Sequence, residues 1–147
     1  MHLFWQKILN RVPPSWRGGS PKTEYQEIGD LSEAFAADFL QYEAGYKILA
    51  KKWERSGYEL DIVAREGDIL VFVEVRSRKK GSKVSGYHSI TQKKRRSLQS
   101  ACKAYLDAMR RRAVHFRFDI IQIEHASSGA REVTHFKNIT LFDRHFH

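Results

Sequence analysis

Apolar and polar residues follow two different periods along this chain, one typical of helices and one typical of strands. Apolar side chains recur every three or four residues over 30–43, which predicts an amphipathic helix that stops at Gly45. The same spacing over 91–112 predicts a second helix. Segments rich in β-branched and aromatic residues predict strands at 46–53, 58–64, 69–76 and 116–124, and a weaker final element at 133–142. This order predicts an α/β fold, with an αβββαβ core and a short mixed β-sheet flanked by helices.

Residues 65–68, Arg-Glu-Gly-Asp, are typical of the turn of a β-hairpin, so the strands on either side are expected to pair. If Gly67 and Asp68 form the turn, the numbers of paired residues sum to 135. Alternation then gives one face that is apolar throughout and suited to the core. This face consists of Leu60, Ile62, Ala64, Ile69, Val71, Val73 and Val75.

The other face of this hairpin gathers charged side chains at its open end. The register places Asp61 opposite Glu74 and Glu59 opposite Arg76. Crowded carboxylates raise one another's pKa unless a cation compensates, and Mg²⁺ or Mn²⁺ prefers such oxygen ligands. The pattern therefore has two interpretations, a divalent metal site able to hydrolyse a phosphodiester and an ordinary cluster of salt bridges.

Positive charge is concentrated in one part of the chain. The formal net charge is +9, yet residues 76–112 alone carry thirteen Lys and Arg against one acid, Asp107. Such a local excess is typical of a surface that binds the phosphates of nucleic acid, although a solvated basic face is the alternative for any short run. The residues expected to contact phosphates are Arg78, Lys79, Lys80, Lys83, Lys93, Lys94, Arg95 and Arg96.

Other features concern the surroundings of the protein. The single cysteine, Cys102, excludes an internal disulfide framework and favours a reducing cytoplasm. No apolar run approaches the roughly 18 residues that span a bilayer, and the N-terminus lacks a signal-peptide pattern. We therefore expect a cytoplasmic protein with no membrane partner. Residues 1–28 lack periodicity and hold all three prolines, which predicts a loop-rich arm before one domain at 29–147.

Six short blocks of sequence carry a family resemblance. They read GDLSE at 29–33, GY at 45–46, ELDIV at 59–63, VFVEVRSR at 71–78, ITQKK at 90–94 and RFDII at 117–121. Together they resemble the YraN-like proteins, distant relatives of archaeal Holliday junction resolvases. Asp61 followed by Glu74-Val75-Arg76 is similar to the D…(D/E)-x-K signature of the PD-(D/E)XK nuclease superfamily. The resemblance covers roughly residues 29–124 and implies a restriction-endonuclease-like fold for a nuclease-like domain at 29–147.

The resemblance also implies roles for individual residues. Asp61 and Glu74 would be the metal-binding pair, Glu33 on the first helix would join them, and Glu59 would lie in contact with the metal or directly behind its ligands. Arg76 stands where the superfamily usually has a catalytic lysine. Arginine is too basic to act as a general base, so its role would be electrostatic.

The departure at Arg76 leaves three outcomes open. The role of the missing lysine passes to Lys93 or Lys94, Arg76 suffices through its charge alone, or cleavage is weak or lost. The implied function is a Mg²⁺- or Mn²⁺-dependent endonuclease acting on nucleic acid, DNA rather than RNA, with structured or branched DNA as the expected substrate. The alternative is a nucleic-acid-binding module that keeps the nuclease fold without efficient cleavage. A homodimer is expected from the resemblance alone, because junction resolvases work as symmetric dimers.

Two candidates also have structural interpretations. Asp30-x-x-Glu33 matches a helix N-terminal capping box, with Asp30 as the N-cap and Glu33 at the third helical position. Arg117 and Asp119 share one face of a predicted strand, so they are expected to pair with each other.

Overall fold

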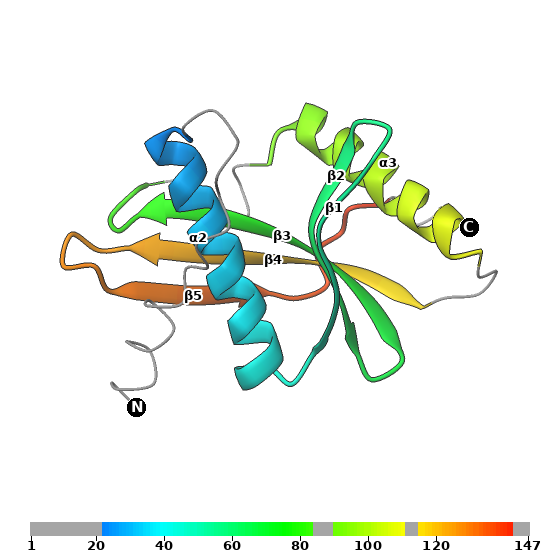
Figure 1. Ribbon diagram of the computed structural model, residues 1–147, viewed down its shortest axis with the longest axis horizontal. Helices are drawn as coiled ribbons and strands as arrows, with labels where there is room; N and C mark the ends of the chain where they lie inside the picture. Colours follow the sequence, from blue (N-terminus) through cyan, green and yellow to red (C-terminus); the bar gives the residue numbers. More distant parts are fainter. Residues whose placement is uncertain (1–21, 84–89, 111–114, 143–147) are drawn as a thin grey trace.

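The computed structural model describes residues 22–83, 90–110 and 115–142. Two helices, one π-helical turn and five strands make up this part of the chain (Figure 1). In chain order they are α2 (Glu24–Asp38), η1 (Phe39–Glu43), β1 (Lys47–Arg55), β2 (Tyr58–Glu66), β3 (Ile69–Lys79), α3 (Gln92–Met109), β4 (Phe116–His125) and β5 (Arg131–Phe136). The predicted order of elements is confirmed. The final strand β5 begins slightly earlier than the element expected at 133–142 and covers only the first part of it.

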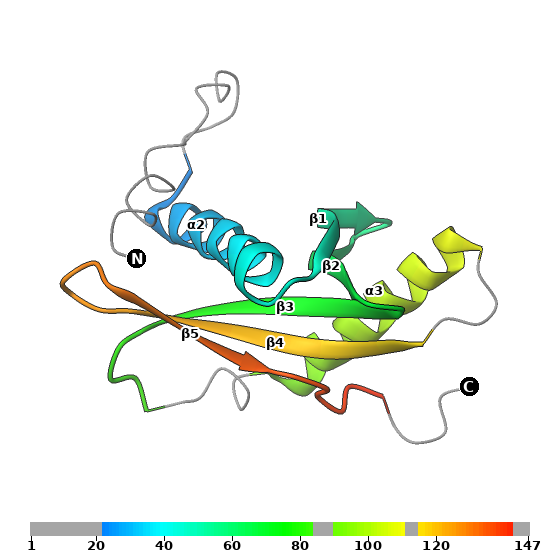
Figure 2. The ribbon, with the colours of Figure 1, turned by 90° about the horizontal axis from the view of Figure 1, so that it is seen from below.

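The five strands form one mixed sheet in the order β1-β2-β3-β4-β5. The pair β3–β4 is parallel and the other three pairs are antiparallel. A parallel pair needs a long crossover, and the segment with α3 supplies it. Figure 2 shows α2 on one side of β3, β4 and β5 and α3 on the other. The α/β class with a mixed sheet flanked by helices is therefore confirmed.

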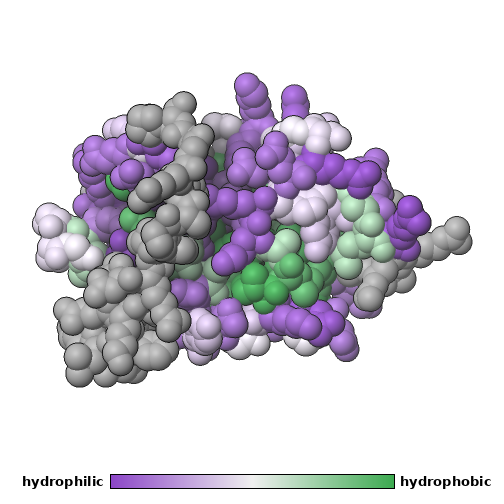
Figure 3. All heavy atoms as spheres, in the orientation of Figure 1, coloured by the Kyte–Doolittle hydropathy of each residue, from purple (hydrophilic) through white to green (hydrophobic). Residues whose placement is uncertain are grey.

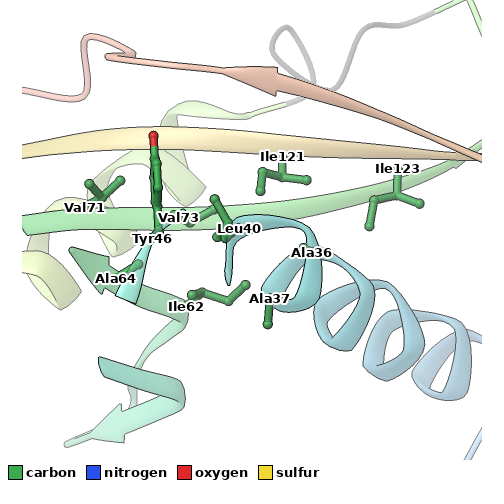
Figure 4. Packing of buried hydrophobic residues seen from close by; sticks show 10 residues of the cluster. All are labelled: Ala36, Ala37, Leu40, Tyr46, Ile62, Ala64, Val71, Val73, Ile121 and Ile123. Carbon is green, nitrogen blue, oxygen red and sulfur yellow. The ribbon is translucent and has the colours of Figure 1, made fainter. Parts of the chain in front are cut away.

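Two apolar clusters lie on opposite faces of this sheet. The cluster beneath α2 contains Val71 and Val73 of β3, and the cluster beneath α3 contains Leu70 and Phe72 of the same strand. This follows from the period of two in a strand, which sends successive side chains to opposite faces. Figure 4 shows the α2 cluster, in which Leu40 and the helix alanines pack against strands β2, β3 and β4.

The hairpin register is confirmed where β2 and β3 pair. The register runs from Glu66 opposite Ile69 to Ile62 opposite Val73, so the numbers sum to 135. The predicted apolar face is wrong at two positions. Leu60 belongs to the α3 cluster, because β2 has left β3 at this point and lies against β1, with Trp53 opposite. Ile69, beside the turn, is more than a third exposed.

The first helix begins earlier than the apolar pattern predicts. Thr23 is the N-cap of α2, and its side chain accepts a hydrogen bond from the backbone N–H of Gln26. The Gln26 side chain in turn accepts from the Thr23 backbone N–H, which completes a capping box. The predicted capping box at Asp30 and Glu33 is therefore wrong, because both residues lie inside the helix. Residues 24–28 of the predicted arm are helical, and residues 1–21 lie outside the described part.

Removing this cap should weaken the helix measurably. We expect Thr23→Ala to lower the free energy of unfolding by about 1 kcal/mol, because the Gln26 N–H loses its acceptor. Urea denaturation at pH 7 measures the change. Ser97→Ala, an exposed position within α3, serves as the control and should change stability by less than about 0.5 kcal/mol. An equally small effect of Thr23→Ala would show that α2 does not depend on this cap.

Asp119 of β4 lies at the centre of a buried polar cluster. Its carboxylate accepts from Arg117 Nε at 3.0 Å, from His135 Nε2 at 2.9 Å and from the Asn138 backbone N–H at 2.9 Å. Arg117 also donates to the Tyr46 hydroxyl at 2.5 Å and pairs with Glu66 at 2.5 Å. The predicted pairing of Arg117 with Asp119 is confirmed. The cluster joins β4, β5 and the end of the β2–β3 hairpin.

Candidate active site

The candidate site lies where strands β2 and β3 separate. The residues of β2 that precede Ile62 turn away from β3 and pair only with β1. The β1–β2 hairpin that they form crosses over the sheet in Figure 1. At the point of separation the carboxylate of Asp61 replaces a main-chain acceptor, since its Oδ2 accepts from the Val75 backbone N–H at 2.8 Å. We call the surroundings of this carboxylate the fork, comprising Asp61 of β2, Glu74 of β3 and Glu33 of α2.

Glu74 contributes a buried carboxylate to the fork from the side of α3. Only 3% of this residue is exposed. Its Oε1 lies 3.1 Å from Lys94 Nζ and 3.6 Å from an Arg76 guanidinium nitrogen, whereas its Oε2 is buried without a hydrogen-bond partner. Burial, together with the charge of Asp61, raises the pKa of Glu74 from 4.5 to about 7. A buried oxygen without a hydrogen bond costs free energy, and a carboxylate oxygen in this state can serve as a ligand for a cation.

Glu33 of α2 interacts with the carboxylate of Asp61. Its side chain is 21% exposed, and its Oε2 is buried with no hydrogen-bond partner, 3.6 Å from Lys52 Nζ. Burial raises the pKa of Glu33, and the neighbouring charge of Asp61 raises it further. Both glutamates thus interact electrostatically with Asp61, which places the three predicted metal ligands in one region of the fold.

The donor chemistry of the fork fits a hard divalent cation, although lysines now neutralise its charge. Carboxylate oxygens are the ligands that Mg²⁺ and Mn²⁺ prefer, and two of them here lack hydrogen bonds. In the described part of the chain, however, no three His, Cys, Asp or Glu side chains already stand in an arrangement that could hold a metal. The ammonium groups of Lys94 and Lys52 accompany Glu74 and Glu33 instead.

Glu59 is not in the fork. It is exposed and lies opposite Glu54 in the β1–β2 hairpin, and the predicted pairing with Arg76 falls beyond the last pair of the β2–β3 register. The physical reason is that β2 pairs with β3 only from Ile62 onward, so Glu59 and Asp61 both lie in the part of β2 that runs beside β1 alone. Figure 3 shows hydrophilic residues over much of the described surface in this view, together with a hydrophobic patch near its middle.

The predicted basic surface divides into two groups. Four of its members have partners within the protein. Arg78 pairs with Glu124 at 2.9 Å, Lys80 with Glu132 at 2.9 Å and Lys94 with Glu74, and Arg95 donates to the Thr140 carbonyl at 2.6 Å. The other four, Lys79, Lys83, Lys93 and Arg96, are exposed. Lys80 is exposed as well, so the two groups differ in their partners within the protein and not in exposure alone.

One residue beside the fork is absent from the sequence-based set. Lys52 of β1 pairs with Asp30 and lies within 3.6 Å of Glu33. Lys52 has a backbone φ of 49°, in the left-handed region, although it lies within a strand. Nothing in a sequence such as Lys51-Lys52-Trp53 indicates such a conformation, so this contact could not be predicted from periodicity.

Comparison with known proteins identifies the family. The model of the uncharacterised protein family UPF0102 matches residues 32–123, a range that includes Glu33, Asp61 and Glu74. A UPF0102 protein from Carboxydothermus hydrogenoformans is 35% identical over 117 residues, covering 80% of this chain and 98% of its own. One from Clostridium perfringens is 35% identical over 114 residues, covering 77% and 93% of the two chains. The resemblance to YraN-like proteins is confirmed at this level, and the chain belongs to the UPF0102 family.

Proposed function

We propose that this protein is a metal-dependent endonuclease that hydrolyses phosphodiester bonds in nucleic acid, with structured or branched DNA as its substrate. The observation that carries the proposal is the fork, where Asp61 interacts electrostatically with Glu33 and with Glu74, and each glutamate keeps a buried oxygen without a hydrogen bond. Purely structural carboxylates are normally satisfied by donors when buried, as Asp119 is in the same sheet.

Glu33, Asp61 and Glu74 are the residues that would hold Mg²⁺ or Mn²⁺. When bound, such an ion polarises a phosphodiester and lowers the pKa of water, which supplies a nucleophile. Contacts within the protein hold two of these carboxylates in place. Asp61 is fixed by its hydrogen bond from the Val75 N–H, and burial within the sheet restricts Glu74.

Lys94 is the residue we assign to the role that the superfamily gives to a lysine on the strand. Sequence alone left Lys93 and Lys94 as equal candidates. Lys94 Nζ lies 3.1 Å from Glu74, whereas its neighbour Lys93 is exposed on α3. An ammonium group held at this position can orient a water molecule or stabilise the charge that develops on a phosphoryl oxygen. Arg76, 3.6 Å from the same carboxylate, adds a second positive charge.

The substrate class rests on charge. Exposed Lys79, Lys83, Lys93 and Arg96 are separate from the paired basic residues and are available for phosphates. One observation favours the alternative of a binding module with weak or no cleavage: the carboxylates of the fork are already accompanied by lysines. The two functions differ in whether a divalent ion binds to these carboxylates.

The deciding experiment combines labelled Holliday junctions, flaps, duplex and single strands with Mg²⁺, Mn²⁺ or EDTA. We expect cleavage only with a divalent ion, and none by Asp61→Ala. In single-turnover reactions Lys94→Ala should lower the cleavage rate by about 10²-fold, because a transition-state contact is lost.

Lys93→Ala is the matched control for Lys94→Ala, since it removes the same charge one residue away. It should weaken substrate affinity without a comparable loss of rate at saturating protein. Salt-sensitive binding of all substrates without cleavage under either metal would establish the binding module instead. Cleavage that survives Asp61→Ala would reject the fork as the site.

A further inference from the structure

We infer that Lys52 is the resident cation of the fork, and that a divalent metal ion must displace its ammonium group from Glu33 in order to bind. The inference rests on the proposed function, because it concerns how the metal site of the nuclease is controlled. It assigns a regulatory role to a residue of β1 that none of the sequence motifs includes.

The backbone of Lys52 is the first observation. Four non-glycine residues in the described part have a positive φ, namely Lys52, Ser56, Arg110 and Asn138. Three of them lie where chains normally turn, between β1 and β2, at the end of α3 and after β5. Lys52 alone lies inside a strand, where its φ of 49° is disfavoured for a residue with a Cβ. Such strain persists at positions where the surrounding contacts require it.

The position of Lys52 in the ladder is the second observation. Its neighbours Lys51 and Trp53 lie opposite Ile62 and Leu60 of β2. Counting between these two pairs places Lys52 at the position opposite Asp61, the central carboxylate of the fork. The distorted backbone thus occurs at the one position of β1 that faces the predicted metal ligand.

The contacts of the ammonium group are the third observation. Lys52 Nζ pairs with Asp30 and lies 3.6 Å from Glu33 Oε2, one of the two buried oxygens without a hydrogen bond. The Lys52 side chain is 46% exposed, so it can leave Glu33 for solvent without breaking the core. The ion pair with Asp30 would keep the lysine close to the fork after its ammonium group has left Glu33.

These observations describe a competition for one carboxylate. A divalent ion and an ammonium group cannot both occupy the position beside the buried Glu33 Oε2, so metal binding includes the cost of breaking the Lys52–Glu33 pair. Partly exposed pairs of this kind are weak, which makes the competition reversible. The lysine lowers metal affinity without preventing binding, and it keeps the acidic fork neutralised when no metal is present.

The test measures Mn²⁺ affinity of the full chain by calorimetry, without substrate. We expect Lys52→Gly to bind Mn²⁺ about two- to fivefold more tightly than the wild type, because the competing cation is gone. Lys52→Ala should show the same tightening but a lower urea midpoint than Lys52→Gly, because alanine retains the disfavoured φ. If Lys52 only positioned Glu33, both variants would instead bind Mn²⁺ more weakly.

Two further variants separate displacement from a general effect of charge. Lys51→Ala removes a neighbouring exposed lysine that acts on Asp38, and it should leave Mn²⁺ affinity within twofold of the wild type. In a Glu33→Gln background, Lys52→Gly should give no tightening, since the shared carboxylate is absent. Equal tightening in Lys51→Ala or in the Glu33→Gln background would overturn the inference.

The failure of this inference differs from the failure of the proposed function. If the wild type binds Mn²⁺ and Lys52→Gly binds no more tightly, the displacement is wrong while the metal site stands. If the wild type binds no Mn²⁺ but Lys52→Gly does, the lysine excludes the metal and is not displaced by it, so the displacement is overturned while the carboxylates of the fork still form a metal site. If no variant binds a divalent ion, both the metal site and the displacement are rejected.

Discussion

Replacing Glu74 by glutamine should abolish cleavage and at the same time stabilise the metal-free protein at alkaline pH. Cleavage should fall by about 10³-fold, because the variant loses the buried carboxylate that pairs with Lys94 and that we propose as a metal ligand. Stability should rise because burial and the charge of Asp61 raise the pKa of Glu74 to about 7, so the wild type holds an unfavourable charge above that pH.

The sign of the pH dependence follows from this raised pKa. The folded protein binds the Glu74 proton more tightly than the unfolded chain, whose carboxyl has an ordinary pKa near 4.5. The wild type should therefore lose stability as pH rises from about 4.5 through about 7, whereas Glu74→Gln should not. Urea denaturation in EDTA at pH 8 should show a gain on the order of 1–3 kcal/mol for the variant, and the gain should vanish at pH 5.

Glu59→Gln is the control for this experiment. Glu59 lies in the neighbouring strand but is exposed, so its substitution should change stability by less than about 0.5 kcal/mol at either pH. A Glu74→Gln protein less stable than the wild type at pH 8 would contradict the prediction, as would a gain of equal size at pH 5. The first result would mean that Glu74 is held as a stabilising ion pair with Lys94 and Arg76. The second would mean that the gain does not come from the charge of Glu74.

This site could be predicted from sequence only where local rules apply. Gly67 and Asp68 fix the turn, and the turn fixes the register, so the relation between Ile62 and Val73 follows by counting. The separation of β2 from β3 does not follow by counting. It depends on β1 and on the side chain of Asp61, which binds the Val75 N–H in place of a main-chain acceptor. Counting along the hairpin therefore places Glu59 opposite Arg76, whereas in the structure it lies opposite Glu54.

The helix start and the basic surface show the same limit. Thr23-x-x-Gln26 and Asp30-x-x-Glu33 both match a capping box, and the sequence alone does not choose between them. In the structure Thr23 caps the helix, and Asp30 lies inside it and pairs with Lys22 and Lys52. Ion pairs of Arg78 and Lys80 join residues that are 46 and 52 positions apart in the chain. Charge counting along the sequence detects the excess of cations, but it cannot tell which of them the fold has already paired.

The second large effect is expected at Asp119, which is a buried carboxylate like Glu74 but has a charge that stabilises the fold. Although burial alone would raise the pKa of Asp119, hydrogen bonds from His135, Arg117 and the Asn138 N–H hold it below its ordinary value of 3.8. Asp119→Ala should lower the free energy of unfolding by about 3–5 kcal/mol, because it leaves Arg117 and a backbone N–H without their buried acceptor. Urea denaturation at pH 7 gives this value.

Glu132→Ala breaks an exposed pair with Lys80 and should cost no more than about 1 kcal/mol, which separates burial from charge. Because the folded pKa of Asp119 is depressed, its contribution is present above pH 3.8 and is lost as pH falls below that value. The difference between the wild type and Asp119→Ala should therefore shrink on acidification, whereas Glu74→Gln differs from the wild type only at high pH. A cost at Asp119 no larger than at Glu132 would reject the polar cluster as a determinant of the fold. The fork is assigned as the functional site because Glu74 keeps a buried oxygen without a hydrogen bond, whereas Asp119 on the adjacent strand is fully supplied with donors. If those donors did not stabilise Asp119, this contrast between the two carboxylates would no longer support the assignment.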